Sequence, residues 1–228
     1  MLVFGVASVS MLMPALYAAG VGEIVTGRAF LYSSIFGIII FVLFALAHSG
    51  RSPEHGALGP LLSLFSTFVI LPFALAVPFY EALQNTSYFN AYIEMVSSIT
   101  TTGANLFADP DRLAPPLHLW RAQVAWLGGM LLWIAASAIL APLSLGGFEV
   151  TTRGEPGRAA SGPSMITRAD PRKRLLRITV MLAPVYAGLT LTLWVLLLIS
   201  GERSLTSLCH AMSVMATSGI SSVGGRWF

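Results

Sequence analysis

The chain has 228 residues, of which 55% are hydrophobic and only 10% are charged, and its mean hydropathy is +0.76. A soluble globular domain carries roughly 25% charged residues, so this composition excludes a soluble protein and indicates an integral membrane protein. The single cysteine, Cys209, excludes an intramolecular disulfide framework and a cysteine-based metal cluster. The net charge of +3 is small, and its distribution along the chain is more informative than its total.

Five apolar segments have the roughly 20 residues that a helix needs to cross about 30 Å of hydrocarbon. They are residues 2–19, 29–47, 57–80, 118–145 and 174–200. A cleaved signal peptide is the alternative for the first segment, because small residues end it. No Lys or Arg precedes that segment, so the basic start of a signal peptide is missing and a membrane span is favoured.

The basic residues predict the orientation of these spans. Residues 147–177 carry seven of the thirteen Lys and Arg residues of the chain. Because short basic loops stay on the cytoplasmic side of a membrane, we expect this segment and the N-terminus to be cytoplasmic. Residue 228 is then expected on the outer side.

Two further apolar segments are too short to cross a membrane. Residues 88–99 and 204–216 predict helices of about three turns, roughly 18 Å long at 1.5 Å per residue. Each follows a long span on the expected outer side of the membrane. We therefore interpret each as a half-length helix that enters the membrane and turns back.

A turn rich in hydroxyl groups and glycine follows each half-length helix, as SSITTTGANL at 97–106 and SVMATSGISS at 213–222. The two turns align with a separation of 116 residues, and the long spans before them fall into the same register. The matched pairs are Ser97 with Ser213, Thr101 with Thr217, Thr102 with Ser218, and Gly103 with Gly219. This agreement predicts an internal repeat, which is typical of membrane proteins built around a shared pathway.

Non-helical backbone at membrane depth is tolerated only where it is buried in protein or lines a water-filled cavity. The carbonyl groups of such a turn can replace the hydration shell of an alkali cation. Glycine permits backbone angles that other residues avoid, and the C-terminal end of the preceding helix favours positive charge. The alternative is close helix–helix packing through small residues, but two turns in register favour a cation pathway.

The segments YFNAYIEMVSSITTTGANLF (88–107) and WRAQVAWLGGMLLWIAASAILAPL (120–143) resemble the first pore loop and the following inner helix of the TrkH/KtrB/HKT superfamily of potassium transporters. Members of that superfamily have four span–pore-loop–span repeats around one pore. The resemblance implies an all-α membrane protein with two N-terminal spans, one complete repeat and a second repeat truncated after its filter. The implied division is 1–50 for the N-terminal helix pair, 51–146 for the first repeat, 147–173 for a basic cytoplasmic linker, and 174–228 for the incomplete second repeat.

The resemblance also implies an ion-binding role for two selectivity-filter segments. They are Thr101, Thr102, Gly103 and Ala104 in the first repeat, and Thr217, Ser218, Gly219 and Ile220 in the second. In this superfamily a filter glycine in every repeat goes with potassium selectivity. We therefore expect potassium uptake, with potassium as the transported ion and no cofactor in this chain.

The expected setting is the inner (cytoplasmic) membrane of a bacterium, where the lipid bilayer is one partner. Full-length members of the superfamily form homodimers and pair with a cytosolic nucleotide-binding ring, so both partners are implied, and nucleic acid is not. Because only two of four filter segments are present, we expect a fragment of a longer transporter. A non-conducting assembly or remnant protein is the alternative.

Glu94 and His210 occupy equivalent positions, nine residues before each turn glycine. An ionisable residue inside a membrane is a functional hypothesis by default. We expect both to support the half-length helices by bonding to loop backbone behind the turns, because buried polar groups find partners. An intramembrane enzyme that uses them as a catalytic pair is the less favoured alternative, and two ligands from separate repeats make a weak metal site.

Other polar and aromatic residues have ordinary explanations. Asp109 and Asp111 either concentrate cations at a pore mouth or form a turn. Arg121 is expected to extend its side chain to the outer membrane interface. Four tryptophans are expected to anchor helices at the interface and to pack between them: Trp120, Trp126, Trp133 and Trp194.

Overall fold

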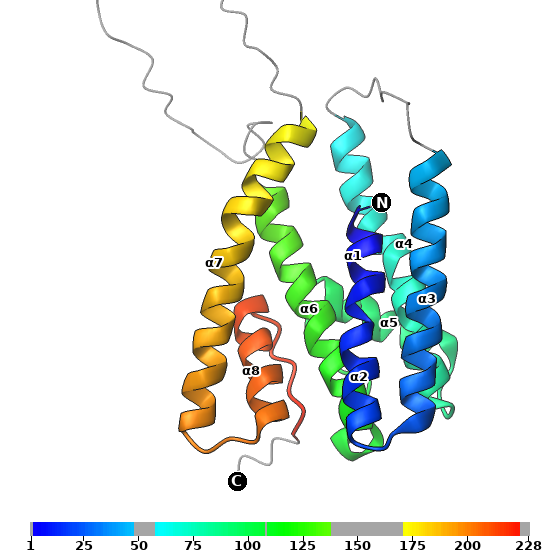
Figure 1. Ribbon diagram of the computed structural model, residues 1–228, viewed down its shortest axis with the longest axis vertical. Coiled ribbons are helices and arrows are strands. Elements are labelled where there is room, and N and C mark those ends of the chain that lie inside the picture. Colours follow the sequence, from blue (N-terminus) through cyan, green and yellow to red (C-terminus); the bar gives the residue numbers. More distant parts are fainter. Residues whose placement is uncertain (1, 48–57, 108, 138–170, 224–228) are drawn as a thin grey trace, which may run out of the picture.

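The computed structural model describes residues 2–47, 58–107, 109–137 and 171–223, and in this part of the chain helices are joined by turns and irregular segments, with no strand. Figure 1 shows a bundle of helices in which α5 and α8 lie among the longer ones. The elements are α1 (Leu2–Ser10), α2 (Leu12–Gly20), α3 (Ile24–Ala47), α4 (Leu58–Leu83), α5 (Tyr88–Ile99), the short 3₁₀ helix η1 (Pro110–Arg112), α6 (Pro115–Ala135), α7 (Pro171–Ile199) and α8 (Ser204–Ala216). The expected all-α architecture is confirmed.

Four segments of the described chain are long and apolar enough to cross a membrane: Leu2–Val21, Ile24–Ala47, Leu61–Leu83 and Leu175–Ile199. They correspond to four of the five predicted spans. Large apolar side chains cover their outer faces, and only 11% of the most apolar part of Leu175–Ile199 is buried inside the protein. Exposed apolar surface on this scale requires an apolar solvent, so the chain is a multi-pass membrane protein.

The fifth predicted span, 118–145, corresponds to α6, and its residues 138–145 lie outside the described part of the chain. In Figure 1, α6 runs between the α7–α8 pair on one side and α1 and α2 on the other. Its first turns carry the polar residues His118, Arg121 and Gln123, and all three are buried. These polar residues lower the hydropathy of α6. They are tolerated because α6 packs against protein on several sides rather than against lipid.

Side chains of α5 and α6 donate hydrogen bonds to backbone carbonyls of α4 close to its two internal prolines. Pro72 and Pro78 lie inside α4 and cannot donate a backbone hydrogen bond to the preceding turn. Tyr92 of α5 donates its hydroxyl to the carbonyl of Val69 at 3.1 Å, and Trp120 of α6 donates its indole N–H to Leu75 at 3.2 Å. These two carbonyls lie three residues before the prolines, one position after the carbonyl that each proline leaves without a donor. The two bonds fix α5 and α6 against α4.

In the first span, a side chain from a distant helix satisfies a carbonyl that a proline leaves without a donor. This span is interrupted between α1 and α2 at Met11, and Pro14 follows in the first turn of α2. Pro14 has no N–H to donate to the carbonyl of Ser10, four residues earlier. The side-chain amide of Gln123 in α6 donates to that carbonyl at 2.8 Å. Gln123 therefore links the N-terminal helices to α6.

We expect Gln123→Met to lower the stability of the protein by about 1–3 kcal/mol, because it leaves the partly buried Ser10 carbonyl without a donor. The melting temperature in detergent measures the loss. A Pro14→Ala background is the matched control, since the alanine in that variant has an N–H that can donate to the Ser10 carbonyl. The cost of Gln123→Met should shrink in that background, and an equal cost in both backgrounds would contradict this account.

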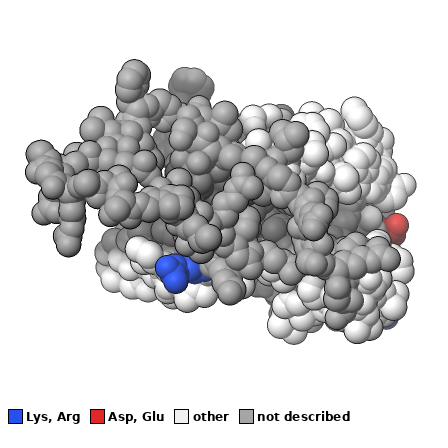
Figure 2. Space-filling model, turned by 90° about the horizontal axis from the view of Figure 1, so that it is seen from above, with Lys and Arg blue, Asp and Glu red and all other residues white. Residues whose placement is uncertain are grey.

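The helix ends alternate between the two ends of the molecule. In Figure 1 the N-terminal ends of α1, α4 and α7 and the C-terminal ends of α3 and α6 lie at the upper end, and the α2–α3 and α7–α8 turns lie at the lower end. Where described residues are visible from the upper end, most are uncharged, with a basic group and an acidic group among them (Figure 2). The predicted basic linker, 147–173, lies outside the described residues up to residue 170.

Candidate ion-conduction site

The first candidate turn begins where α5 ends. Ser87 caps the helix by accepting a hydrogen bond from the backbone N–H of Asn90 at 3.2 Å. After Ile99 the backbone reverses, with positive φ angles at Thr101 (57°) and Gly103 (70°). The N–H of Thr102 donates to the carbonyl of Ser97 at 3.0 Å, which folds the turn back onto the end of α5.

The second candidate turn repeats this geometry after α8. Thr217 has a φ of 53° and Gly219 a φ of 68°, at the positions that align with Thr101 and Gly103. The N–H of Ser218 donates to the carbonyl of Ser213 at 3.0 Å, and this bond is equivalent to the one between Thr102 and Ser97 in the first turn. Figure 1 shows α8 rising from the lower end of the molecule only partway, after which the chain returns toward that end.

Both turns hold a threonine in the left-handed region of backbone space. A β-branched residue at positive φ is uncommon, and each such residue costs roughly 1–2 kcal/mol. Strain of this kind persists where the surrounding structure enforces it and is concentrated at ligand-binding sites. Two equivalent threonines with the same strained backbone angle show that the two turns share one conformation.

The two turns lie against each other, although 116 residues separate them. A Cβ atom on Gly103 would overlap the carbonyl oxygen of Ser218. Ile220, at the end of the second segment, is buried in a small cluster with Ala125 of α6 and Ala216. The carbonyl of Ala104, at the end of the first segment, accepts a hydrogen bond from the hydroxyl of Ser97 at 2.7 Å.

A buried ion pair lies behind the first turn. Glu94 of α5 and Arg121 of α6 are only 1% and 2% exposed, and Oε1 of Glu94 lies 2.6 Å from Nε of Arg121. This contact is a charge pair without hydrogen-bond geometry at Nε. The expectation that Arg121 reaches the membrane interface is wrong, because a carboxylate from another helix holds its guanidinium inside the protein.

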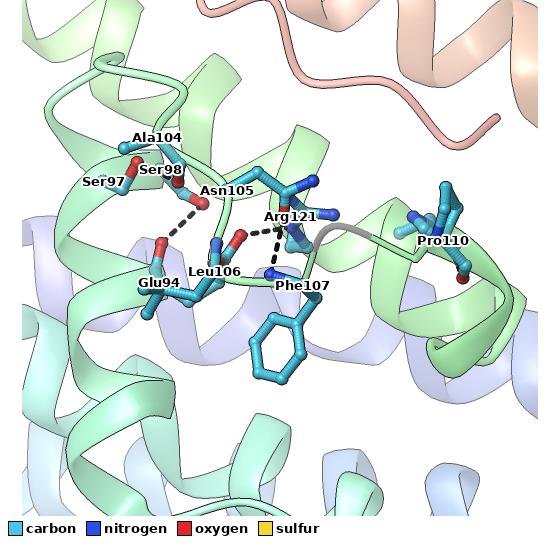
Figure 3. Close-up of polar contacts among 10 residues, drawn as sticks. Glu94, Ser97, Ser98, Ala104, Asn105, Leu106, Phe107, Pro110 and Arg121 are labelled. Atoms are coloured by element: carbon cyan, nitrogen blue, oxygen red, sulfur yellow. Dashed lines mark hydrogen bonds and ion pairs between the residues drawn. The ribbon is translucent and has the colours of Figure 1, made fainter. Parts of the chain in front are cut away.

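The same two side chains hold the segment that leaves the first turn (Figure 3). Oε2 of Glu94 accepts the backbone N–H of Leu106 at 3.1 Å. Arg121 donates from its second terminal nitrogen to the side-chain oxygen of Asn105 at 3.0 Å, and that oxygen also accepts the N–H of Phe107 at 3.0 Å. Sequence reasoning missed Asn105 and the pairing of Arg121.

His210 has a different environment from its counterpart Glu94. Its Nε2 atom lies 3.0 Å from the hydroxyl of Ser221, and Ser221 aligns with Asn105 of the first repeat. Glu94 and His210 are thus engaged by different partners, which gives no support to a catalytic pair. Within the described residues, no group of three or more His, Cys, Asp or Glu side chains could hold a metal ion.

The remaining candidates have local contacts. Asp109 accepts the N–H of Asp111 at 3.1 Å and so caps η1, which is a turn-forming contact. Trp126 donates its indole N–H to Thr190 of α7 at 2.8 Å, and Trp194 donates to the carbonyl of Ser204 at 3.2 Å. With Trp120 buried against α4, these three tryptophans pack between elements of the bundle.

Two glycines of α6 bring the ends of both half-length helices together. A Cβ atom on Gly128 would overlap the carbonyl oxygen of Ile99, at the end of α5. A Cβ atom on Gly129 would lie 3.1 Å from the Cα of Ala216, at the end of α8. The WLGG segment of α6 (residues 126–129) therefore packs against the residues that lead into both turns.

The protein is an all-α, multi-pass membrane protein with paired internal turns. Its helical bundle encloses two half-length helices, and each of them ends in the same strained turn. No protein-family model matches the chain. The comparisons with individual proteins are more informative.

The chain is 28% identical over 217 residues to the Trk system potassium uptake protein TrkH of Vibrio parahaemolyticus. The matched region covers 94% of this chain and 43% of that protein. It is 30% identical over 154 residues to the Trk system potassium uptake protein TrkI of Halomonas elongata, covering 68% of this chain and 28% of that protein. The crystal structure of the potassium transporter TrkH from Vibrio parahaemolyticus matches with a TM-score of 0.76 and 24% identity, over 100% of this chain and 44% of that one.

The chain spans less than half the length of these relatives. Over that part, its sequence is similar to TrkH-type potassium transporters and its fold matches theirs. The resemblance predicted from the pore-loop and inner-helix segments is confirmed.

Proposed function

We propose that this chain forms part of a potassium uptake pathway across a membrane. Carbonyl groups of the two turns, Thr101–Ala104 and Thr217–Ile220, are the proposed ligands for the dehydrated ion. The observation that carries the proposal is that two turns 116 residues apart in the sequence share their positive φ angles and lie in contact. A packing role alone does not require two strained threonines at equivalent positions.

The electrostatics of the turns support a cation. Each turn follows directly on the C-terminal end of a helix, where the partial negative charge of the helix dipole favours positive charge. Gly103 and Gly219 allow the carbonyl groups on either side to point in directions closed to other residues. Similarity to Trk system potassium uptake proteins supports potassium as the ion and transport rather than enzymatic chemistry.

The proposal extends to the setting of the protein. We propose that the upper end of the molecule in Figure 1 lies on the cytoplasmic side of a bacterial inner membrane, because the basic segment 147–177 of the sequence runs into α7, which begins at that end. The division into 1–50, 51–146, 147–173 and 174–228 is retained as a proposal. A homodimer and a cytosolic nucleotide-binding ring are proposed partners, on the resemblance alone.

Uptake of rubidium-86 into proteoliposomes tests the function. The protein is the product of the complete reading frame that encodes this chain, and empty vesicles give the background. We expect uptake above background, with potassium competing more strongly than sodium. A protein that is folded and inserted but takes up no rubidium would leave the non-conducting assembly or remnant protein as the better explanation.

A further inference from the structure

We infer that the buried pair Glu94–Arg121, together with Asn105, positions the first turn and so sets the discrimination between potassium and sodium. This inference rests on the proposed function. It adds Arg121 and Asn105 as positioning residues, which act on the ion through the backbone that they hold.

The geometry of the pair fixes both ends of a short segment. Glu94 belongs to α5, which leads into the turn, and its carboxylate accepts the N–H of Leu106, which lies beyond the turn. Only Thr100–Ala104 lie between the end of α5 and the anchored residues 105–107. The bond from Ser97 to the carbonyl of Ala104 crosses the same loop. A loop of five residues that is held at both ends and across its width has few alternative conformations.

Burial makes the pair act as a unit. Both side chains are almost completely shielded from solvent, so neither charge can leave its partner without remaining unpaired in the protein interior. Because Arg121 belongs to α6, the pair also joins α5 and the loop to the helix that contacts both turns. A change in the position of α6 is therefore transmitted to the first turn.

The second turn has a weaker connection at the equivalent place. His210 replaces Glu94, and its contact is with the hydroxyl of Ser221. Ser222, which aligns with Leu106, has a buried hydroxyl that makes no hydrogen bond in the described part of the chain. In the described part of the chain, the loop after the first turn is thus held by side chains of two helices, α5 and α6, and the loop after the second turn is contacted by His210 of α8.

The test measures how strongly potassium and sodium compete with rubidium-86 uptake by the product of the complete reading frame. The double variant Glu94→Met/Arg121→Met removes both charges at similar volume, so no charge is left unpaired. The preference for potassium is measured as the competition constant of sodium divided by that of potassium. We expect this ratio to fall about tenfold, as for the loss of one charge-assisted hydrogen bond. Arg28→Met, at an exposed arginine of α3, is the control and should keep the ratio.

A second variant keeps the inference testable if the double variant does not fold. Asn105→Ala leaves the ion pair in place and removes only the anchor for the loop, and we expect a fall of about threefold. A ratio that stays within about twofold of the parent in a folded double variant, or in Asn105→Ala, would overturn the inference. Failure of the proposed function looks different, because the parent protein itself would then take up no rubidium.

Discussion

Gly103→Ala is expected to destabilise the protein far more than Gly219→Ala, although the two glycines occupy equivalent positions. Both have nearly the same backbone angle, with φ of 70° and 68°. An alanine at such an angle costs roughly 1 kcal/mol. At Gly103 the new Cβ also overlaps the carbonyl oxygen of Ser218, whereas at Gly219 no described atom lies within 4 Å of it. Overpacking adds about 1–3 kcal/mol, so we expect about 2–4 kcal/mol at Gly103 and about 1 kcal/mol at Gly219.

Thermal unfolding in detergent compares the two variants, and rubidium-86 uptake shows their effect on the pathway. We expect Gly103→Ala to abolish uptake, because the second turn must move away from the first to make room for the new methyl group. Gly219→Ala should retain part of the activity, since only its own turn is strained. Equal losses of stability would mean that the backbone angle alone decides the outcome and that the two turns do not touch.

The sequence predicts the turns well because their signal is local and repeated. A glycine at the aligned position after each of two half-length helices indicates a backbone angle that other residues avoid, and the angles of Gly103 and Gly219 agree. The separation of 116 residues also predicts that Thr101 and Thr217 adopt the same conformation. Their left-handed angles could not be predicted, because threonine does not favour that region by itself.

The polar interior of α6 could not be predicted because its partners are distant in the sequence. A single arginine at the start of an apolar segment is typical of an interface position, and the partner carboxylate lies 27 residues earlier on another helix. Gln123 is explained only when Pro14 is seen to leave the Ser10 carbonyl free. The apolar character of 118–145 predicts a span, but hydropathy measures each residue alone and cannot show which polar residues of α6 are buried against other helices.

The small residues Gly128 and Gly129 have a meaning that only packing reveals. Paired glycines in a helix indicate a close approach of some neighbour, but not which one. In the structure, Gly128 faces the end of α5 and Gly129 faces the end of α8. The spacing between the two turns therefore depends on the absence of side chains at adjacent positions of one helix.

Gly128→Ala is accordingly the second substitution with a large expected effect. Alanine normally stabilises the interior of a helix relative to glycine by about 0.5–1 kcal/mol. At Gly128, however, the added methyl group overlaps the carbonyl oxygen of Ile99, which is backbone and cannot rotate away as a side chain would. Either α5 or α6 must shift, and overpacking of this kind costs about 1–3 kcal/mol. Because Ile99 directly precedes the first turn, we also expect weaker discrimination between potassium and sodium.

Gly188→Ala in the middle of α7 is the matched control, because no described atom lies within 4 Å of a Cβ atom at that position. It should raise the melting temperature slightly, since it gains helix propensity without a steric conflict, and it should leave rubidium-86 uptake unchanged. The two glycine-to-alanine changes are thus expected to alter stability in opposite directions. If Gly128→Ala also stabilised the protein, α5 would not be seated against α6 at this point, and the spacing of the turns would have to be set by the Glu94–Arg121 pair alone.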